Sequence, residues 1–207
     1  MKMIILAGMP ATGKSTLAKT LAVEFGYPII EKDNIKEGLF DVLGFENYAR
    51  KRRLDEAANM VLLRMTEAMI KGDCSVIIDN NFDAESGRCL CELIERYQPD
   101  CVTIFLGGNI QTLYERYVDR DEHHRRHLGH ILQDHYPPME GETTDYRMSR
   151  EEFDEKFVRR GMDKFHCPGA RITVDMTCPE QVDIDALVKE IRGMWREEAY
   201  HEEKDNT

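Results

Sequence analysis

The residues whose types and spacing most clearly indicate chemistry lie near the N-terminus, in the run Gly8-Met9-Pro10-Ala11-Thr12-Gly13-Lys14-Ser15. It fits the pattern G-x-x-x-x-G-K-[ST], in which glycines let the backbone curl until its N–H groups surround phosphate oxygens. We expect Lys14 to bridge the β- and γ-phosphates of ATP and the Ser15 hydroxyl to ligate Mg²⁺. The alternative is a glycine-rich turn without function, but an apolar run before it and an amphipathic stretch after it favour phosphate binding. The residues predicted to bind the nucleotide here are Gly8, Met9, Pro10, Ala11, Thr12, Gly13, Lys14, Ser15 and Thr16.

A carboxylate further along the chain could complete a magnesium site. Asp79 closes the apolar run 74–78, and an acid at the carboxyl end of a buried parallel strand lies in the crevice where α/β sheets bind ligands. We therefore expect Asp79 to support Mg²⁺, directly or through water. The alternative is an ordinary cap, because Asp79-Asn80-Asn81 is also good turn chemistry.

A second strand-end aspartate could face the phosphate acceptor. Asp33 follows the short apolar run 28–30 and could accept a proton from an acceptor hydroxyl. The alternative role is structural, since Asp33 or Asn34 could also cap the helix that follows. Lys36 lies one helical turn further on the same face, where it would either contact the acceptor or remain a solvated surface lysine.

Residues 114–130 give this acidic protein a local positive region. Arg116 and Arg120 are spaced i, i+4, so both project from one helix face, and planar guanidinium groups suit phosphate oxygens. Arg125 and Arg126 extend the region into a loop that could close over ATP. The alternative is a solvated helix face on which nearby aspartates and glutamates pair with the arginines.

The histidines of this segment and a second basic cluster each allow more than one interpretation. The same segment contains His123, His124, His127 and His130, and His127-x-x-His130 has the spacing of a metal-ligand pair. No acid or cysteine stands at a convincing spacing from that pair, so we favour no metal there. The cluster 50–53 could contact an anionic acceptor or begin a solvated helix.

Short apolar runs that alternate with longer periodic stretches predict βαβ units and a parallel sheet that positions these residues. The predicted strands are 3–7, 28–30, 74–78, 101–106 and 171–175. The predicted helices are 14–25, 34–43, 54–71, 84–97, 110–118, 150–164 and 184–195. We interpret residues 1–195 as one domain that includes a lid, about residues 119–150, followed by a polar C-terminal tail, residues 196–207.

Composition narrows the class of protein. The 207 residues are 42% hydrophobic and 32% charged, which fits a soluble α/β protein. A net charge of −11 argues against a general binder of long nucleic acid, whose affinity comes from lysine and arginine. No apolar stretch approaches a membrane span, and the N-terminal apolar run is too short for a secretory signal. We expect a cytoplasmic protein whose six scattered cysteines are reduced.

A resemblance follows from these motifs. The chain resembles small P-loop kinases often labelled AAA-family ATPases and is similar to the kinase heads of polynucleotide 5′-hydroxyl kinases, chloramphenicol phosphotransferase and zeta toxins. The shared motifs are the P-loop, Glu31-Lys32-Asp33-x-x-Lys36-Glu37, Ile77-Ile78-Asp79, and Arg116-x-x-x-Arg120 followed by Arg126-His127-x-Gly129-His130.

The resemblance implies a three-layer α/β/α P-loop NTPase fold with a five-stranded parallel sheet of order 2-3-1-4-5. It implies acceptor contacts from Asp33 and Lys36, and phosphate contacts from Arg120 and Arg126. Adenine would lie near residues 177–181. Residues 40–60 and 131–150 match none of the acceptor-binding loops of these kinases.

Three functions are compatible with these residues. The first is an ATP- and Mg²⁺-dependent phosphotransferase that moves the γ-phosphate to a hydroxyl of a small molecule or a nucleotide end. In it Lys14, Asp33, Arg120 and Arg126 are catalytic, and Arg116 also contacts the nucleotide. The second is a nucleotide-dependent ATPase or switch that acts on a protein partner. The third, a binding module without turnover, is disfavoured by the intact Lys14, Ser15 and Asp79.

Overall fold

The computed structural model describes residues 1–122, 126–142 and 147–205, and for residues 196–205 it describes the backbone alone. Within these ranges no helix is both long and apolar enough to cross a membrane.

Five parallel strands form a single sheet in the order β2-β3-β1-β4-β5, as the resemblance implied. The strands are β1 (Lys2–Gly8), β2 (Ile29–Glu31), β3 (Val76–Asp79), β4 (Asp100–Gly107) and β5 (Ala170–Asp175). The register pairs Leu6 with Asp79 and Asp79 with Glu31, so the carboxyl ends of β1, β3 and β2 lie at one edge. The loops that follow these strands therefore meet at a common site.

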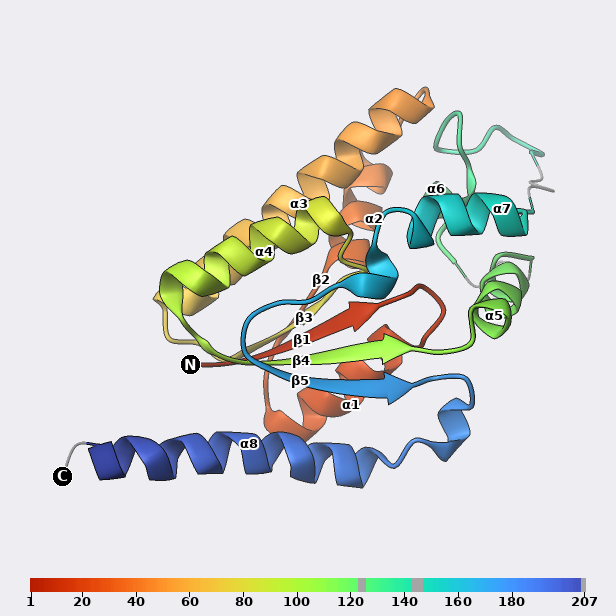
Figure 1. Cartoon of the computed structure of the whole chain (residues 1–207). Helices are drawn as coiled ribbons and strands as arrows, with labels where there is room; N and C mark the ends of the chain where they lie inside the picture. The colour runs from red at the N-terminus through yellow and green to blue at the C-terminus, as the bar shows by residue number, and fades with distance from the viewer. Residues whose placement is uncertain (123–125, 143–146, 206–207) are drawn as a thin grey trace.

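Helices cover both faces of the sheet (Figure 1). Helix α1 (Lys14–Phe25) and helix α8 (Ile184–Asp205) lie on one face, and α3 (Tyr48–Lys71) and α4 (Ala84–Tyr97) lie on the other. Alternation along β1 divides the core: Ile4 and Leu6 pack towards α1 and α8, whereas Met3 and Ile5 pack towards α3 and α4.

The remaining helices gather beyond the carboxyl ends of the strands (Figure 1). These are α2 (Lys32–Leu43), α5 (Ile110–Glu122), α6 (Leu128–Ile131) and α7 (Arg150–Phe153). The segment between α5 and α7 packs onto the domain through two small apolar clusters. One joins α5 to α7 through Tyr117 and Phe153, and the other joins α2 to the segment through Phe40 and Leu132.

Three predicted helix bounds are corrected. Helix α3 begins at Tyr48 rather than at residue 54, because the Asn47 side chain accepts a hydrogen bond from the Arg50 amide and caps it. The predicted helix 150–164 is broken into α7, a π-helical turn η1 (Asp154–Val158) and a 3₁₀ turn η2 (Met162–Lys164), with Gly161 at φ 80° between the last two. Helix α8 continues to Asp205, so the backbone of most of the predicted tail is helical. A further 3₁₀ turn, η3 (Pro179–Gln181), precedes α8.

Candidate nucleotide and acceptor site

The predicted phosphate-binding loop has the backbone that its glycines allow. Gly8 has φ 126°, and a Cβ there would lie 2.0 Å from the Leu106 carbonyl oxygen on the neighbouring strand, so only glycine fits. Gly13, at φ 84°, takes the left-handed conformation that leads into α1. The loop opens on a cleft that we call the phosphate cleft, lined by Pro10, Ala11, Gly13, Lys14, Ser15, Thr16, Glu31, Lys32, Asp33, Asp79, Asn80, Asn81, Arg120 and Arg126.

Lys14 is folded back onto this loop. Its ammonium donates hydrogen bonds to the carbonyl oxygens of Met9, at 2.6 Å, and Gly8, at 3.3 Å, and to the Thr12 hydroxyl at 3.3 Å. Burial lowers the pKa of Lys14 to about 8, against the carboxylates of Asp79 and Asp33, which raise it. A cation held in so little water gains strongly from an anionic ligand, which is the role predicted for Lys14.

Two carboxylates compete for the single proton of the Ser15 hydroxyl. The hydroxyl oxygen lies 2.7 Å from Asp79 Oδ2 and 2.8 Å from Glu31 Oε1, but a hydroxyl has one hydrogen to donate. The second contact therefore needs another proton or a cation. Burial raises the pKa of Asp79 to about 6, although the Lys14 ammonium and the Ser15 hydrogen bond oppose the rise.

This oxygen-rich arrangement fits the predicted magnesium site. The donor set is a hydroxyl and two carboxylates, the hard oxygen ligands that Mg²⁺ prefers. Sequence reasoning missed Glu31. Its position at the end of β2, beside Asp79 in the register, is the signal that could have found it.

Asp33 faces the same cleft from the first turn of α2. Neither Asp33 nor Asn34 caps this helix, because the N-cap residue is Glu31 and it makes no side-chain cap hydrogen bond. Burial alone would raise the pKa of Asp33, but the positive charges of Arg126, Lys36 and, when it is protonated, His130 outweigh it and lower the pKa. Asp33 is therefore an ionised hydrogen-bond acceptor at neutral pH.

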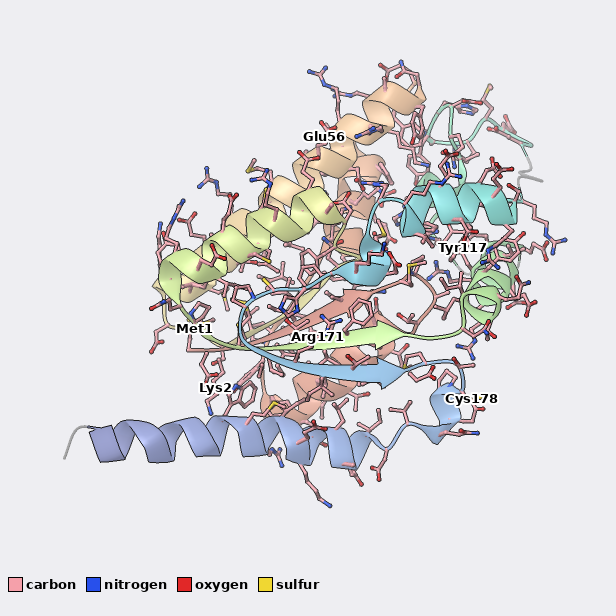
Figure 2. All side chains as sticks on the ribbon, viewed as in Figure 1. Met1, Lys2, Glu56, Tyr117, Arg171 and Cys178 are labelled. Atoms are coloured by element: carbon pink, nitrogen blue, oxygen red, sulfur yellow. The ribbon has the colours of Figure 1, made fainter. Side chains whose placement is uncertain are left out.

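Arg120 and Arg126 also line the phosphate cleft, and their predicted contacts with phosphate stay predictions. Both guanidinium groups lie over the ring of the buried Tyr117, 5.4 Å and 5.2 Å from its centre, and Arg126 donates a 2.7 Å hydrogen bond to the Tyr117 hydroxyl. Figure 2 shows Tyr117 between α5 and α7. In the described part of the chain, Arg120 Nε is buried without a hydrogen-bond partner, so it is free to bind an anion. The position of Tyr117 was not anticipated.

Arg116 is not brought to this cleft. Its guanidinium donates to the carbonyl oxygens of Met176, at 2.5 Å, and Thr177, at 2.6 Å, beside the segment where the resemblance places adenine. One helical turn separates Arg116 from Arg120, yet the loop after β5 engages only the first of them. The geometry does not support a phosphate contact from Arg116, and its contact with a nucleotide stays a prediction.

Two histidines of the lid bind carboxylates of α2. His127 Nε2 lies 3.0 Å from Asp41 Oδ1, and its Nδ1 accepts a hydrogen bond from the Gly129 amide, so Nε2 is the donor. His130 Nε2 lies 3.0 Å from Glu37 Oε1, and burial lowers the pKa of His130 to about 4 although Glu37 opposes this. Both rings hold the lid against α2. The predicted basic and histidine residues Arg125, His123 and His124 lie outside the described residues.

Two further predicted basic features, Lys36 and the cluster 50–53, make contacts within the protein. Lys36, which was predicted to contact the acceptor, forms a 2.7 Å ion pair with Asp55, which also binds Lys32 at 2.9 Å. In the cluster 50–53, Lys51 is buried and donates to the carbonyl oxygens of His130 and Leu132, and so it holds the lid.

Comparison with known proteins identifies the family and supports the fold. Residues 3–138 match a family model described as AAA domain. A presumed kinase from Chloroflexus aurantiacus J-10-fl has 26% sequence identity and a TM-score of 0.73 over 95% of this chain and 96% of its own.

Two more distant structures share the fold. A gluconokinase from Sinorhizobium meliloti 1021 has 18% identity and a TM-score of 0.55 over 97% of both chains. Kti12 from Chaetomium thermophilum, in complex with ADP-AlF3, has 15% identity and a TM-score of 0.56 over 93% of this chain and 98% of its own.

These structures share a P-loop fold that implies nucleotide binding, and kinases are prominent among them. The narrower likeness to polynucleotide 5′-hydroxyl kinases, chloramphenicol phosphotransferase and zeta toxins stays a prediction. The match over residues 3–138, together with the phosphate-binding loop and the sheet order, shows that this chain belongs to the AAA-domain family of P-loop proteins.

Proposed function

We propose that this protein is an ATP-dependent phosphotransferase that moves the γ-phosphate to a hydroxyl group of a separate acceptor. The observation that supports this most strongly is that the phosphate-binding loop, Asp33 and two arginines line one cleft. Phosphoryl transfer needs positioned reactants and compensated charge more than it needs covalent chemistry. The cleft supplies groups for both needs.

On this proposal the loop amides and Lys14 bind the triphosphate. Lys14 exchanges its hydrogen bonds to Met9 and Gly8 for phosphate oxygens, which are better partners for a buried ammonium. Ser15, Asp79 and Glu31 are the residues that would hold Mg²⁺. When bound there, the ion offsets phosphate charge.

Asp33 is suited to align the acceptor hydroxyl. Its lowered pKa makes it a weak base, so its main contribution is a hydrogen bond that points an oxygen lone pair of the acceptor at the γ-phosphate. In a loose transition state the hydroxyl proton leaves late, when it has become acidic enough for such a carboxylate to accept.

Arg120 and Arg126 act from the lid. Both can bind the transferring phosphoryl group, and their closure over the cleft keeps water away from it. The positioned carboxylate and a lid that covers the cleft favour transfer to an acceptor over hydrolysis. In the alternative, a protein-regulated ATPase, the cleft would have to admit water as the attacking group.

The test is an acceptor screen with γ-labelled ATP and Mg²⁺. Label that moves to a hydroxyl compound, with ADP formation stimulated by that compound, would support the proposal. Label released only as inorganic phosphate, at a rate that no acceptor changes, would contradict it and favour the ATPase.

A further inference from the structure

A second cavity of about 620 Å³ opens directly from the phosphate cleft. The two share Lys32, Asp33, Asn80, Asn81 and Arg126, so a molecule in the second cavity can present a hydroxyl to Asp33. This volume lies within the range of small-molecule sites, roughly 300–1,000 Å³. Its walls come from α2, α3, α5 and the turns around η1, and we call it the acceptor cavity.

Most of the acids that line the acceptor cavity already form ion pairs or hydrogen bonds within the protein. Asp55 is bound by two lysines, which leaves one positive charge in excess within that group. Asp83 caps α4 and also pairs with Arg160. Glu155 pairs with Arg159 at 2.8 Å.

Two further acids, Asp134 and Glu152, line the cavity. Glu152 accepts a hydrogen bond from the Ser149 amide, at the start of its own helix. Asp134 is exposed on the lid. The remaining carboxylate is that of Asp33. It lies at the junction with the phosphate cleft, where it would accept the hydrogen bond of the acceptor hydroxyl on the proposed function.

Two of the cations that line the cavity, Arg126 and Lys156, have no carboxylate oxygen within hydrogen-bond distance among the described residues. Arg126 donates to the Tyr117 hydroxyl, and it lies 3.7 Å from a carboxylate oxygen of Asp121. Lys156 has no hydrogen bond or ion pair with any described residue and lies 5.7 Å from the centre of the Phe157 ring. It is half-buried, and burial lowers its pKa to about 8, helped by the positive charges of Arg126 and Lys36.

Lys156 lies in the π-helical turn η1, at the wall of the cavity. Phe153 and Phe157, four residues apart, pack together in the apolar cluster of the lid, and Lys156 lines the cavity. A lysine without a partner in such a site is costly unless an anion compensates it. The position of Lys156 in the wall of the cavity and the lack of a partner for its ammonium among the described residues together point to an anionic ligand.

We propose that the acceptor is a small hydroxylated anion, whose carboxylate or phosphate group is bound by Lys156 with Lys36 while its hydroxyl faces Asp33. This inference rests on the proposed phosphotransferase function and names the class of its acceptor. Lys156 then selects the acceptor by charge.

The first test uses matched acceptors that differ in charge: glycerol with glycerate and glycerol 3-phosphate, ribose with ribose 5-phosphate, and glucitol with gluconate. Transfer to an anionic member should exceed transfer to its neutral counterpart. Exclusive transfer to neutral members, or to the 5′ end of a hydroxyl-ended oligonucleotide, would overturn the inference and leave the proposed function standing. A preference for carboxylates or for phosphates identifies which anion binds.

The second test compares Lys156→Gln with Lys164→Gln, which removes a positive charge from an exposed position in the neighbouring turn η2, outside the cavity. Lys156→Gln should lower kcat/KM for the anionic acceptor by about 10- to 100-fold and leave the KM for ATP unchanged, because one charged contact is lost. Lys164→Gln should change neither. Equal effects of the two variants would refute the role of Lys156. An unchanged or higher unfolding temperature for Lys156→Gln shows that its loss is not misfolding.

A binding measurement separates this inference from the proposed function. With the phosphate cleft filled by a non-hydrolysable ATP analogue and Mg²⁺, inorganic phosphate should bind wild-type protein in the low millimolar range, and Lys156→Gln should weaken that binding. The phosphate site should be present even if no acceptor in the screen is phosphorylated. No binding of phosphate to the wild type, or binding that Lys156→Gln leaves unchanged, would overturn the inference.

Discussion

The substitution Tyr117→Phe removes one hydroxyl and tests whether that hydroxyl positions Arg126 for catalysis. Tyr117 is 1% exposed, and its hydroxyl is the 2.7 Å partner of Arg126. Tyr114, on the same helix, donates a 3.0 Å hydrogen bond to the Met148 carbonyl oxygen and has no contact with either lid arginine. Tyr114→Phe is therefore a matched control, because it also deletes one hydroxyl and one hydrogen bond from α5.

The two variants should differ in rate. A hydrogen bond to a charged group contributes about 1.5–3 kcal/mol, which corresponds to about 10- to 150-fold in rate if it positions Arg126 in the transition state. The phenyl ring keeps its packing against Phe153 and Phe157, at 5.5 and 5.4 Å between ring centres. Tyr114→Phe should lose about 1 kcal/mol of unfolding free energy, and Tyr117→Phe about 1.5–3 kcal/mol, because its hydroxyl bonds a charged group.

The assay measures kcat and the KM for ATP with the phosphorylated acceptor, or with water if hydrolysis is the measurable reaction, together with denaturant unfolding. Tyr117→Phe should lower kcat by at least about tenfold with little change in the KM for ATP, because the arginine acts on the transferring group. Tyr114→Phe should retain kcat. If the two variants have the same kcat, Tyr117 does not position Arg126 for catalysis and the assignment fails.

Three further outcomes follow from the phosphate cleft. Lys14→Ala should abolish turnover and weaken ATP binding in calorimetry; full retained activity would rule out the mechanism. Asp33→Asn should lose transfer by about 100-fold or more yet keep ATP affinity, and an equal loss of both would make Asp33 structural. Because burial raises the pKa of Asp79 from 3.8 to about 6, protonation favours the folded free protein, and this contribution is lost as pH rises from about 4 to about 6. Asp79→Asn should therefore unfold at a higher temperature than wild type at pH 7 without ligand, and Mg²⁺-dependent ATP affinity of the wild type should fall as pH decreases from 7 to 5. A lower unfolding temperature, or an affinity insensitive to pH over that interval, would contradict the role of Asp79.

The parts of the site that were predictable from sequence are those with local causes. The loop from Gly8 to Ser15 takes its shape from the spacing of its own glycines, and Asp33 and Asp79 were found because each follows a buried strand. Arg120 was found by its i, i+4 spacing from Arg116 and Arg126 by its place in the basic run that follows, and the resemblance implied their phosphate contacts. The strand order itself depended on the resemblance, since apolar runs alone do not specify which strands are neighbours.

The parts that were not predictable depend on contacts distant in sequence. Nothing local distinguishes Lys51 from its three basic neighbours, and it is buried because carbonyl groups of the lid, 79 and 81 residues away, accept its hydrogen bonds. Lys156 lies in a stretch with helical periodicity, and its place in a cavity wall depends on residues of α2 and α3 that are distant in sequence. Residues 196–205 lack the apolar spacing on which the helix prediction depends, yet the backbone continues helically.

On the proposed function, the contacts between the lid and α2 are expected to couple acceptor binding to the position of Arg126. Helix α2 carries Asp33 in its first turn and, further along, Glu37 and Asp41, which bind His130 and His127 of the lid. One rigid helix therefore holds both the carboxylate that aligns the acceptor hydroxyl and the groups that fix the lid. An acceptor that shifts α2 would also shift the lid, and with it Arg126, which lies next to His127 in the chain. Water has no anionic group with which to engage Lys156 or Lys36, so it lacks the contacts that would favour this closed arrangement. On this argument, discrimination against hydrolysis and recognition of the acceptor are consequences of the same contacts.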